Sequence, residues 1–498
     1  MNIYELISIG LYMLLMILIG LYSYRKSTSN SEDFLIGGRK LGAAVTALSA
    51  GAADMSGWLL MGLPGAMYYS GLSSSWIAIG LTVGAFLNYV LVAPRLRVYT
   101  EIVKDSITLP VYFENRFHDK SQLLKIVSSV FILIFFTLYT SAGMVSGGRL
   151  FESAFGMDYH TGLFVTTFVV VLYTFLGGFL AVSLTDFVQG TIMIVALVLL
   201  PIVLVIQLGG LGETLTIIDT KGSDYLDLFT GTTTISIISL LAWGLGYFGQ
   251  PHILVRFMAI DSVKEISKAR NIGISWMIFT VGGAMLVGLF GVAYLQKFDA
   301  ITMIKFDESK ELSETIFIHL SRVLFHPFIG GFLLSAILAA VMSTISSQLL
   351  VTSSSITEDI FKTFFKRHAS SKNMLLMSRL SVLLVAIIAL VISLNPKDSI
   401  LNLVGNAWAG FGAAFGPLIL LSLLWKRTTA IAGLCGMIVG GAVVLLWVYI
   451  PHDYKEVYEI IPGFLLSFIT IVLISLGTKR VSKEIQKEFE KVKTIINS

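Results

Sequence analysis

Apolar stretches long enough to cross a lipid bilayer recur along almost the whole chain. A helix needs about 20 mostly apolar residues to span the hydrocarbon core, and about thirteen stretches meet this length. They lie near 3–24, 41–69, 74–94, 125–155, 160–178, 186–209, 232–257, 272–296, 314–350, 374–394, 401–424, 430–450 and 459–477. Because a helix satisfies its own backbone hydrogen bonds inside lipid, this pattern predicts an all-α polytopic membrane protein.

Composition supports the same class. Of the 498 residues, 55% are hydrophobic and only 13% are charged, whereas soluble domains carry about 25% charged residues. Cys435 is the only cysteine, which excludes an intrachain disulfide and a cysteine metal cluster. We expect a single transmembrane domain over 1–478 and a cytoplasmic tail at 479–498.

The distribution of basic residues predicts the orientation. Glu5 and no lysine or arginine precede the first span, while Arg25 and Lys26 follow it, unlike the order in a signal peptide. If the chain starts outside and alternates between faces, 27 of its 35 lysines and arginines fall on the inner face. Basic loops stay in the cytoplasm. The chain is therefore predicted to have its N-terminus outside, its C-terminus in the cytoplasm, and an odd number of spans.

Two predicted spans contain features that weaken a membrane helix. Residues 47–65 hold several glycines, a proline and the carboxylate of Asp54, and residues 242–252 are likewise rich in glycine and end near a proline. A charge at the bilayer centre costs at least about 2.5–3.5 kcal/mol. Interrupted spans of this kind are typical of transporters that hold an ion or solute at membrane depth.

The two interruptions occupy corresponding places in the chain. They fall in the second and seventh predicted spans, so each begins a group of five, and the two groups start at opposite faces. This arrangement predicts an inverted repeat of five plus five helices, with extra helices at both ends. Repeat one would cover about 41–209 and repeat two about 232–424.

A third segment offers oxygen ligands. Residues 335–348 combine small side chains with hydroxyls, including the adjacent Ser343 and Thr344. Hard cations such as sodium prefer oxygen, and unwound helices supply free carbonyl oxygens. The alternative is that these hydroxyls only bond back to carbonyls of their own helix.

Two acidic residues within or beside spans have open roles. Asp54 either takes part in ion coupling or ties down unwound backbone amides. Asp186, placed at the start of the sixth predicted span, is either a helix N-cap or an inner waystation for a departing cation.

Aromatic residues near the interruptions suggest walls for a small solute. Trp243, Tyr247 and Phe248 lie in the second interruption, Trp58 lies four residues after Asp54, and Tyr139 lies in the fourth span. A pocket of this kind suits a small molecule with one apolar face. The alternative is ordinary packing or an interfacial belt, and we assign that role to Trp408, Trp425 and Trp447.

Other chemistries have no support in the sequence. The chain lacks the HExxH, GxSxG and Walker A patterns, and its seven histidines are scattered without metal spacing. We expect no enzyme activity, no cofactor, no nucleic-acid binding and no obligate protein partner.

Several motifs together resemble one family, the solute:sodium symporters. The resemblance extends from about residue 20 to residue 470. It is carried by residues 49–65, 177–186, 243–252, 334–348, 356–359 and 408–417. It implies a leucine-transporter-type fold.

The resemblance also implies a sodium site. Its ligands would be carbonyl oxygens and hydroxyls, namely the carbonyls of Ala52, Met55 and Ala340 and the hydroxyls of Ser343 and Thr344. Asp54 and Ser56 would be needed for sodium-coupled transport, and Asp186 would lie on the inner release path. Relatives can carry serine just before the aspartate, whereas this chain has Ala53, to which we assign no side-chain role.

For the solute, the resemblance implies a pocket of Trp58, Tyr139, Trp243, Tyr247 and Pro251. The implied activity is symport: sodium and L-proline enter a bacterial cell together across its inner membrane by alternating access. One inward charge gains about 2.3 kcal/mol per 100 mV. A tenfold sodium gradient adds about 1.4 kcal/mol, so accumulation of roughly several hundredfold is accessible.

Three alternatives stay open. The chain could carry pantothenate or another amino acid, or it could be a membrane sensor or channel on the same scaffold. Lithium or a proton could replace sodium.

Overall fold

The computed structural model describes residues 2–27, 31–365, 370–396, 399–450 and 456–497. Within these residues the chain is helical apart from short connections and one isolated bridge between Leu41 and Ile260. The predicted all-α class is confirmed. Four basic residues included in the charge count lie outside the described residues, namely Lys366, Arg367, Lys397 and Lys455.

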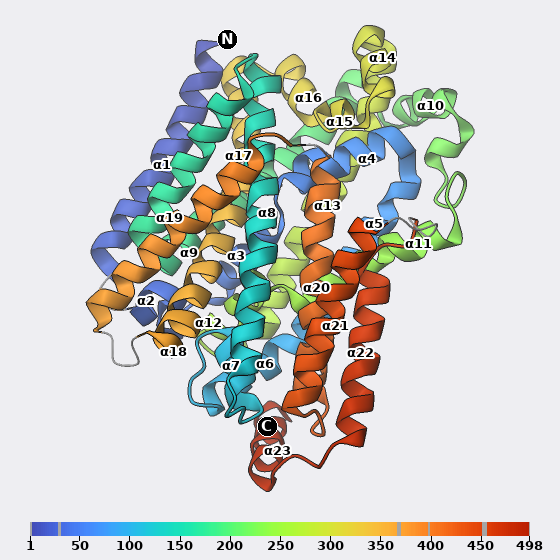
Figure 1. Ribbon diagram of the computed structural model, residues 1–498. Coiled ribbons are helices and arrows are strands. Elements are labelled where there is room, and N and C mark those ends of the chain that lie inside the picture. Colours follow the sequence, from blue (N-terminus) through green and yellow to red (C-terminus); the bar gives the residue numbers. More distant parts are fainter. Residues whose placement is uncertain (1, 28–30, 366–369, 397–398, 451–455, 498) are drawn as a thin grey trace.

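The helices form one elongated bundle (Figure 1). Its main helices are α1 (Ile3–Ser27), α3 (Ala43–Asp54), α4 (Leu63–Ser70), α5 (Ser75–Leu87), α6 (Ala93–Ile102), α8 (Leu123–Phe155), α9 (Tyr159–Leu208), α11 (Thr234–Leu241), α12 (Pro251–Ala259), α13 (Lys264–Phe298), α17 (Pro327–Ser354), α19 (Ser371–Ser393), α20 (Ile400–Leu424), α21 (Ala430–Tyr449) and α22 (Ile460–Gly477). Shorter helices lie at its ends, namely α2 (Ser31–Ile36), α7 (Leu109–Arg116), α10 (Leu211–Lys221), α14 (Ala300–Glu308), α15 (Lys310–Ser313), α16 (Ile316–Leu324), α18 (Lys362–Phe364) and α23 (Lys483–Asn497). The N-terminus and helix α23 lie at opposite ends of the bundle.

Ten helices in the described part of the chain are long and apolar enough to cross a membrane. Two of them, Trp58–Ile102 and Tyr159–Leu208, have 45 and 50 residues. Both exceed the about 20 residues that one crossing needs. The apolar segment Thr234–Gly249 is shorter than a full span. The total of thirteen spans therefore stays a prediction.

The predicted end of the fifth span at 178 coincides with a kink, but the predicted start of the sixth span at 186 is wrong. Helix α9 passes through residues 179–185, which were expected to separate two helices, and it is broken only at Gly178 (φ 55°, ψ −144°). A positive φ favours glycine, and a Cβ at Gly178 would lie 2.5 Å from the ring of Phe34. Asp186 consequently lies inside α9, so the N-cap interpretation of this residue is also wrong.

Both predicted interruptions are confirmed. Helix α3 ends at Asp54, Met55 leaves the helical conformation (φ −80°, ψ 75°), and the chain resumes with a π-helical turn, η2 (Trp58–Gly62). In the second segment α11 gives way to a 3₁₀ helix, η6 (Ala242–Gly249), and Gln250 is extended (φ −82°, ψ 105°) before α12 begins. Each break releases backbone carbonyls from the helical ladder.

Glycines bring α5 and η6 into direct backbone contact. A Cβ added to Gly84 would lie 2.2 Å from the carbonyl oxygen of Gly244, and one added to Gly244 would lie 2.2 Å from that of Gly80. No side chain fits between these two segments. We call Gly80, Gly84 and Gly244 the glycine seam.

At the end of the bundle that carries the N-terminus, one buried carboxylate joins three elements. Glu314 accepts hydrogen bonds from the amides of Ile400 (3.1 Å) and Leu401 (3.2 Å) at the start of α20. It also pairs with Arg149 of α8 at 3.1 Å. Burial raises the pKa of Glu314, whereas the two amides and Arg149 favour its ionised form.

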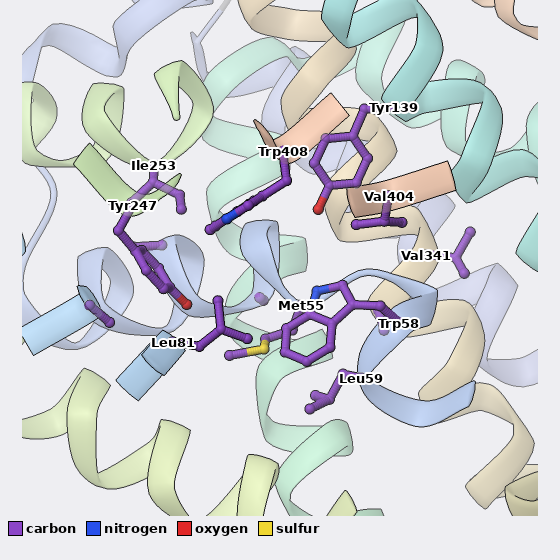
Figure 2. Packing of buried hydrophobic residues seen from close by; sticks show 14 of the residues in the cluster. Met55, Trp58, Leu59, Leu81, Tyr139, Tyr247, Ile253, Val341, Val404 and Trp408 are labelled. Carbon is purple, nitrogen blue, oxygen red and sulfur yellow. The ribbon is translucent and has the colours of Figure 1, made fainter. Parts of the chain in front are cut away.

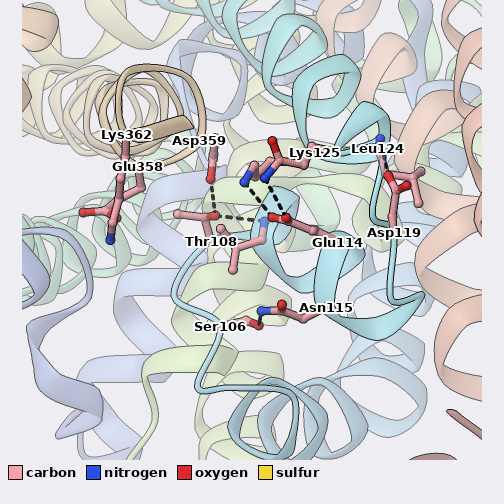
Figure 3. A network of polar contacts seen from close by, with 12 residues as sticks. Ser106, Thr108, Glu114, Asn115, Asp119, Leu124, Lys125, Glu358, Asp359 and Lys362 are labelled. Carbon is pink, nitrogen blue, oxygen red and sulfur yellow. Dashed lines mark hydrogen bonds and ion pairs between the residues drawn. The ribbon is translucent and has the colours of Figure 1, made fainter. Parts of the chain in front are cut away.

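At the opposite end, polar contacts tie η7 (Ser355–Phe361), which continues α17, and the start of α8 to the segment between α6 and α8. Thr108 donates to Asp359 at 2.7 Å, and Lys125 pairs with Glu114 at 2.6 Å (Figure 3). Nearby, the guanidinium of Arg39 contacts the carboxylate of Asp105 at 2.8 Å. Side-chain contacts therefore join several segments at this end of the structure.

The segment predicted as a tail contains the amphipathic helix α23. Its Phe489 packs over the guanidinium of Arg116 (5.7 Å), which also lies against Tyr99 and Phe117. Glu488 pairs with His118 at 3.1 Å. The helix therefore docks on the bundle rather than standing apart from it.

Candidate ion and solute site

The two interrupted segments meet at Asp54. The hydroxyl of Tyr247, from η6, donates a hydrogen bond to Oδ2 of Asp54. The main-chain carbonyl of Asp54 accepts a hydrogen bond from Nε1 of Trp58 at 3.2 Å. The other carboxylate oxygen, Oδ1, is buried and has no hydrogen-bond partner among the described residues. The carboxylate therefore retains capacity to bind a cation or a donor group.

A cluster of oxygen atoms lies where α17 crosses α3. The hydroxyl of Ser343 is 2.7 Å from the carbonyl oxygen of Ala52 and 3.0 Å from that of Ala340. The hydroxyl of Thr344 lies 3.0 Å from the same carbonyl of Ala340. Both hydroxyls bond back to α17, as the alternative interpretation expected, and Ser343 in addition crosses to α3. Such oxygens are the ligand type that a hard cation prefers.

Two neighbouring residues complete this region. Met55 directly follows the break in α3, and its amide donates to the carbonyl of Gly51 at 3.0 Å. The hydroxyl of Ser56 is buried without a hydrogen-bond partner among the described residues. A buried hydroxyl without a partner is uncommon and calls for a ligand or water.

Asp186 lies in a buried ionic cluster. Its Oδ2 accepts hydrogen bonds from Ser49 (2.6 Å) and from Arg256 (3.1 Å), and Arg256 also donates to Ser347 at 2.5 Å. The 27 basic residues counted at the inner face include Arg256 as a loop residue, and this placement is wrong because Arg256 is fully buried inside α12. The predicted span 232–257 included this position, and a charge within a span is the signal that identifies it.

Aromatic side chains face one another above the break in α3 (Figure 2). Tyr247 lies edge-on to Trp408, with ring centroids 5.2 Å apart, and the rings of Tyr139 and Trp58 lie on the other sides of this group. Trp408 was assigned to packing. The structure confirms packing, since Trp408 is 1% exposed, and it shows that the ring in contact is that of Tyr247, which the sequence does not reveal.

The two other residues of the predicted solute pocket are Trp243 and Pro251. The ring of Trp243 stacks on Tyr458 at 5.1 Å, while its carbonyl oxygen accepts a hydrogen bond from Nε1 of Trp408 at 2.8 Å. Pro251 is buried at the first position of α12. Trp243 is thus joined to the aromatic group through its hydrogen bond to Trp408.

Comparison with protein families matches residues 34–440 to the sodium:solute symporter family. The chain belongs to this family. It is therefore a membrane transporter that couples the movement of a solute to sodium.

Named relatives cover nearly the full length. The chain is 59% identical to the osmoregulated proline transporter OpuE of Bacillus subtilis, with 97% of this chain and 96% of the relative covered. It is 53% identical to sodium/proline symporter 2 of Staphylococcus saprophyticus, with 98% and 96% covered.

Solved structures share the fold. A Na+-coupled sialic acid symporter in a substrate-bound outward-open state has a TM-score of 0.80 at 20% identity, with 97% of this chain and 99% of the other covered. The nucleobase-cation-symport-1 family transporter Mhp1, in a closed conformation, has a TM-score of 0.57 at 12% identity, with 93% and 99% covered. These neighbours confirm the leucine-transporter-type fold.

Proposed function

We propose that this symporter carries L-proline into the cell together with sodium, by alternating access. The observation that carries the proposal is the meeting of both interrupted segments at Asp54, beside the oxygen cluster of α17. The names of the two relatives reported above, a proline transporter and a sodium/proline symporter, support the choice of solute.

The sodium ligands follow from the oxygen cluster. We assign them to the carbonyl oxygens of Ala52, Met55 and Ala340 and to the hydroxyls of Ser343 and Thr344. The short Ser343–Ala52 contact supports this assignment. A bound ion would replace that hydrogen bond, so sodium binding would hold α17 and α3 in one relative position.

Coupling is assigned to the polar groups beside the ion. Asp54 reaches the solute side through Tyr247, and Ser56 has a free hydroxyl next to the break. Asp186, held by Ser49 and Arg256, is assigned to the inner release path. The solute is assigned to a pocket of Trp58, Tyr139, Trp243, Tyr247 and Pro251.

Domain limits, orientation and location belong to the same proposal. Residues 1–478 form one transporter domain, with repeats over about 41–209 and 232–424 and a cytoplasmic tail at 479–498. The N-terminus lies outside and the C-terminus in the cytoplasm, in the inner membrane of a bacterium. The transport cycle itself includes no chemical conversion of the solute and uses no cofactor.

Uptake into reconstituted vesicles tests the function. We expect labelled proline to accumulate when an inward sodium gradient is imposed, and not when potassium replaces sodium. Unlabelled amino acids and pantothenate are added as competitors, and lithium and proton gradients serve as separate arms. Stronger competition by another solute than by proline itself would contradict the assigned substrate.

A double substitution tests the sodium ligands. Ser343→Ala with Thr344→Ala should raise the sodium concentration for half-maximal uptake by roughly tenfold or more, since each hydrogen-bond-like contact to a charge contributes about 1.5–3 kcal/mol. Ser335→Ala is the matched control, because its hydroxyl bonds only to Gly331 of the same helix at 2.9 Å. An unchanged sodium requirement in the double variant would remove both hydroxyls from the ligand set.

A further inference from the structure

An outward-facing groove of about 390 Å³ runs between α9 and α19, on the side of the bundle that carries α1 (Figure 1). It extends along α9 from Phe164 to Phe175 and along α19 from Leu383 to Leu390. Thr167 is the only polar residue among those that line it. Both helices are long and apolar enough to cross a membrane. The groove therefore faces the lipid of the bilayer.

A small side chain forms the floor of the groove, and large ones form its rims. Ala386 is 4% exposed, whereas Phe168 and Ile387 are 67% and 59% exposed. The segment of α9 from Phe164 to Phe175 is about 16 Å long, since a helix rises about 1.5 Å per residue. This is about half of a hydrocarbon core of about 30 Å, which is the depth that one leaflet fills. The groove thus has the length of one acyl chain.

One end of the groove carries basic side chains. The guanidinium of Arg379 donates a hydrogen bond to the carbonyl of Phe175 at 3.1 Å and lies 5.7 Å from the centre of the Phe175 ring. Lys372 is exposed and precedes Arg379 by seven residues, so the two lie on one face of α19. Neither 159–178 nor 371–393 contains an aspartate or a glutamate. No carboxylate of these two segments therefore neutralises the two cations.

The other end of the groove differs in charge. There the hydroxyl of Tyr159 on α9 donates to the carbonyl of Ser393 on α19 at 2.7 Å. The exposed carboxylate of Asp158 directly precedes α9 and lies 3.5 Å from the ring of His160. An anionic group is therefore favoured at the end of the groove that carries Arg379. Under the proposed orientation, that end is cytoplasmic.

Charge decides which occupant the groove selects. The acyl chains of any lipid can fill an apolar groove by dispersion contacts, and these contacts do not distinguish one headgroup from another. Basic residues near the membrane surface attract anionic lipids. A second copy of the chain is a poorer match. A two-fold axis along the membrane normal would place the cations of both copies at the same depth, where they repel one another.

We propose that the groove between α9 and α19 binds one anionic phospholipid. One acyl chain of the lipid lies in the groove, and its phosphate lies beside Lys372 and Arg379. Because the lipid contacts both helices, its binding stabilises their packing against each other. This site goes beyond the proposed function and does not depend on which solute is carried.

Native mass spectrometry of the purified protein tests the site. The protein in detergent is mixed with equal amounts of anionic phosphatidylglycerol and zwitterionic phosphatidylcholine that carry the same acyl chains. We expect one phosphatidylglycerol to be retained with roughly 25-fold preference, since each basic residue near a membrane surface contributes roughly fivefold. Lys372→Gln should lower this preference roughly fivefold. Lys268→Gln is the matched control, because Lys268 is also an exposed lysine but lies on α13.

Filling the groove gives a second test. Ala386→Phe places a ring on the floor of the groove and should abolish retention of both lipids. Ile388→Phe is the matched control, since Ile388 is 45% exposed on the same helix and does not line the groove. Added phosphatidylglycerol should raise the thermal midpoint of the unaltered protein and of Ile388→Phe, but not that of Ala386→Phe. The midpoint without added lipid reports whether Ala386→Phe is folded.

Four outcomes would overturn the proposal. The first is equal retention of both lipids by the unaltered protein, and the second is an equal loss of preference in Lys268→Gln and Lys372→Gln. The third is a loss of retention in Thr167→Val, because Thr167 lies about 12 Å along α9 from Phe175 and so away from the basic end. The fourth is a dimer that Ala386→Phe removes, which would make a second copy the occupant. If Ala386→Phe does not fold, the lysine variants decide.

Discussion

Asp54 connects the ion region to the solute region through a single side chain. Its carboxylate accepts from Tyr247 in the second interrupted segment, and its carbonyl accepts from Trp58 beyond the first break. A carboxylate in this position can respond to both an ion and an ammonium group. In the proposed mechanism, that dual contact is the basis for coupling at the scale of a residue.

Replacing Asp54 by asparagine should uncouple sodium from transport. The substitution keeps the size of the side chain and removes its charge, and one hydrogen bond to a charged group contributes about 1.5–3 kcal/mol. Sodium-stimulated proline uptake is expected to fall by at least roughly tenfold, while the amount of inserted protein stays normal by immunoblot. Normal sodium dependence in this variant would take Asp54 out of the mechanism.

The pair of Asp186 and Arg256 should govern stability as well as release. Both side chains are fully buried, and removal of one partner of a buried pair costs about 3–5 kcal/mol. Asp186→Asn and Arg256→Gln should each lower the thermal midpoint of the purified protein. The double variant should recover most of the loss, because no unpaired charge remains. A double variant that is less stable than both single variants would contradict this account.

Sequence patterns located some of these residues and missed others for a physical reason. Asp54 is visible because a carboxylate among glycines in an apolar span has few explanations. Arg256 lies close to the predicted end of its span, so it was counted with the loop charges. Trp408 lies in an unbroken apolar helix, and nothing local distinguishes it from a packing tryptophan.

At the scale of elements, the breaks marked by glycine and proline were predictable, and so was the end of the fifth span at 178, but the resumption of the helix directly after Gly178 was not. The interruptions in α3 and around η6 each combine several glycines with a proline. Helix α9 contains only Gly177 and Gly178 at its kink, and the polar residues that follow resemble a loop. Its continuity depends on packing against α1 and α17, which a local pattern does not contain.

The glycine seam should not tolerate one added methyl group. Gly244→Ala would place a Cβ 2.2 Å from the carbonyl oxygen of Gly80, and overpacking of this kind costs about 1–3 kcal/mol. We expect a lower thermal midpoint and reduced uptake. Gly282→Ala on α13 is the control, since nothing lies within 4 Å of its added Cβ. Equal stability of the two variants would show that the seam can separate without loss.

At the scale of the whole molecule, the sequence predicts a helical membrane bundle, but the number of membrane crossings stays a prediction. Apolar runs identify membrane segments well, and the comparison with solved symporters confirms the fold. An interrupted or kinked helix does not give one apolar run for each membrane crossing. The number of apolar runs therefore does not fix the number of crossings. The N-terminus and α23 lie at opposite ends of the bundle, which fits an odd number of membrane crossings.

Labelling of single cysteines tests the orientation. In a Cys435→Ser background, Lys310→Cys and Lys487→Cys introduce thiols at exposed positions near opposite ends. A membrane-impermeant maleimide should label position 310 in intact cells and position 487 only after permeabilisation, because basic loops stay inside. The reverse pattern would invert the proposed topology. The Cys435→Ser parent reports background labelling.

Helix α23 has a practical consequence for handling the protein. Phe489 covers a guanidinium whose two terminal nitrogens have no hydrogen-bond partner among the described residues. A chain that ends at residue 478 would lack Phe489 and so expose the guanidinium of Arg116 to solvent. It would also lack Glu488, the acidic partner of His118. Purification handles should therefore be appended to the chain that includes α23, and expression yields of shortened forms should be compared with it before any loss of transport is ascribed to the transport site.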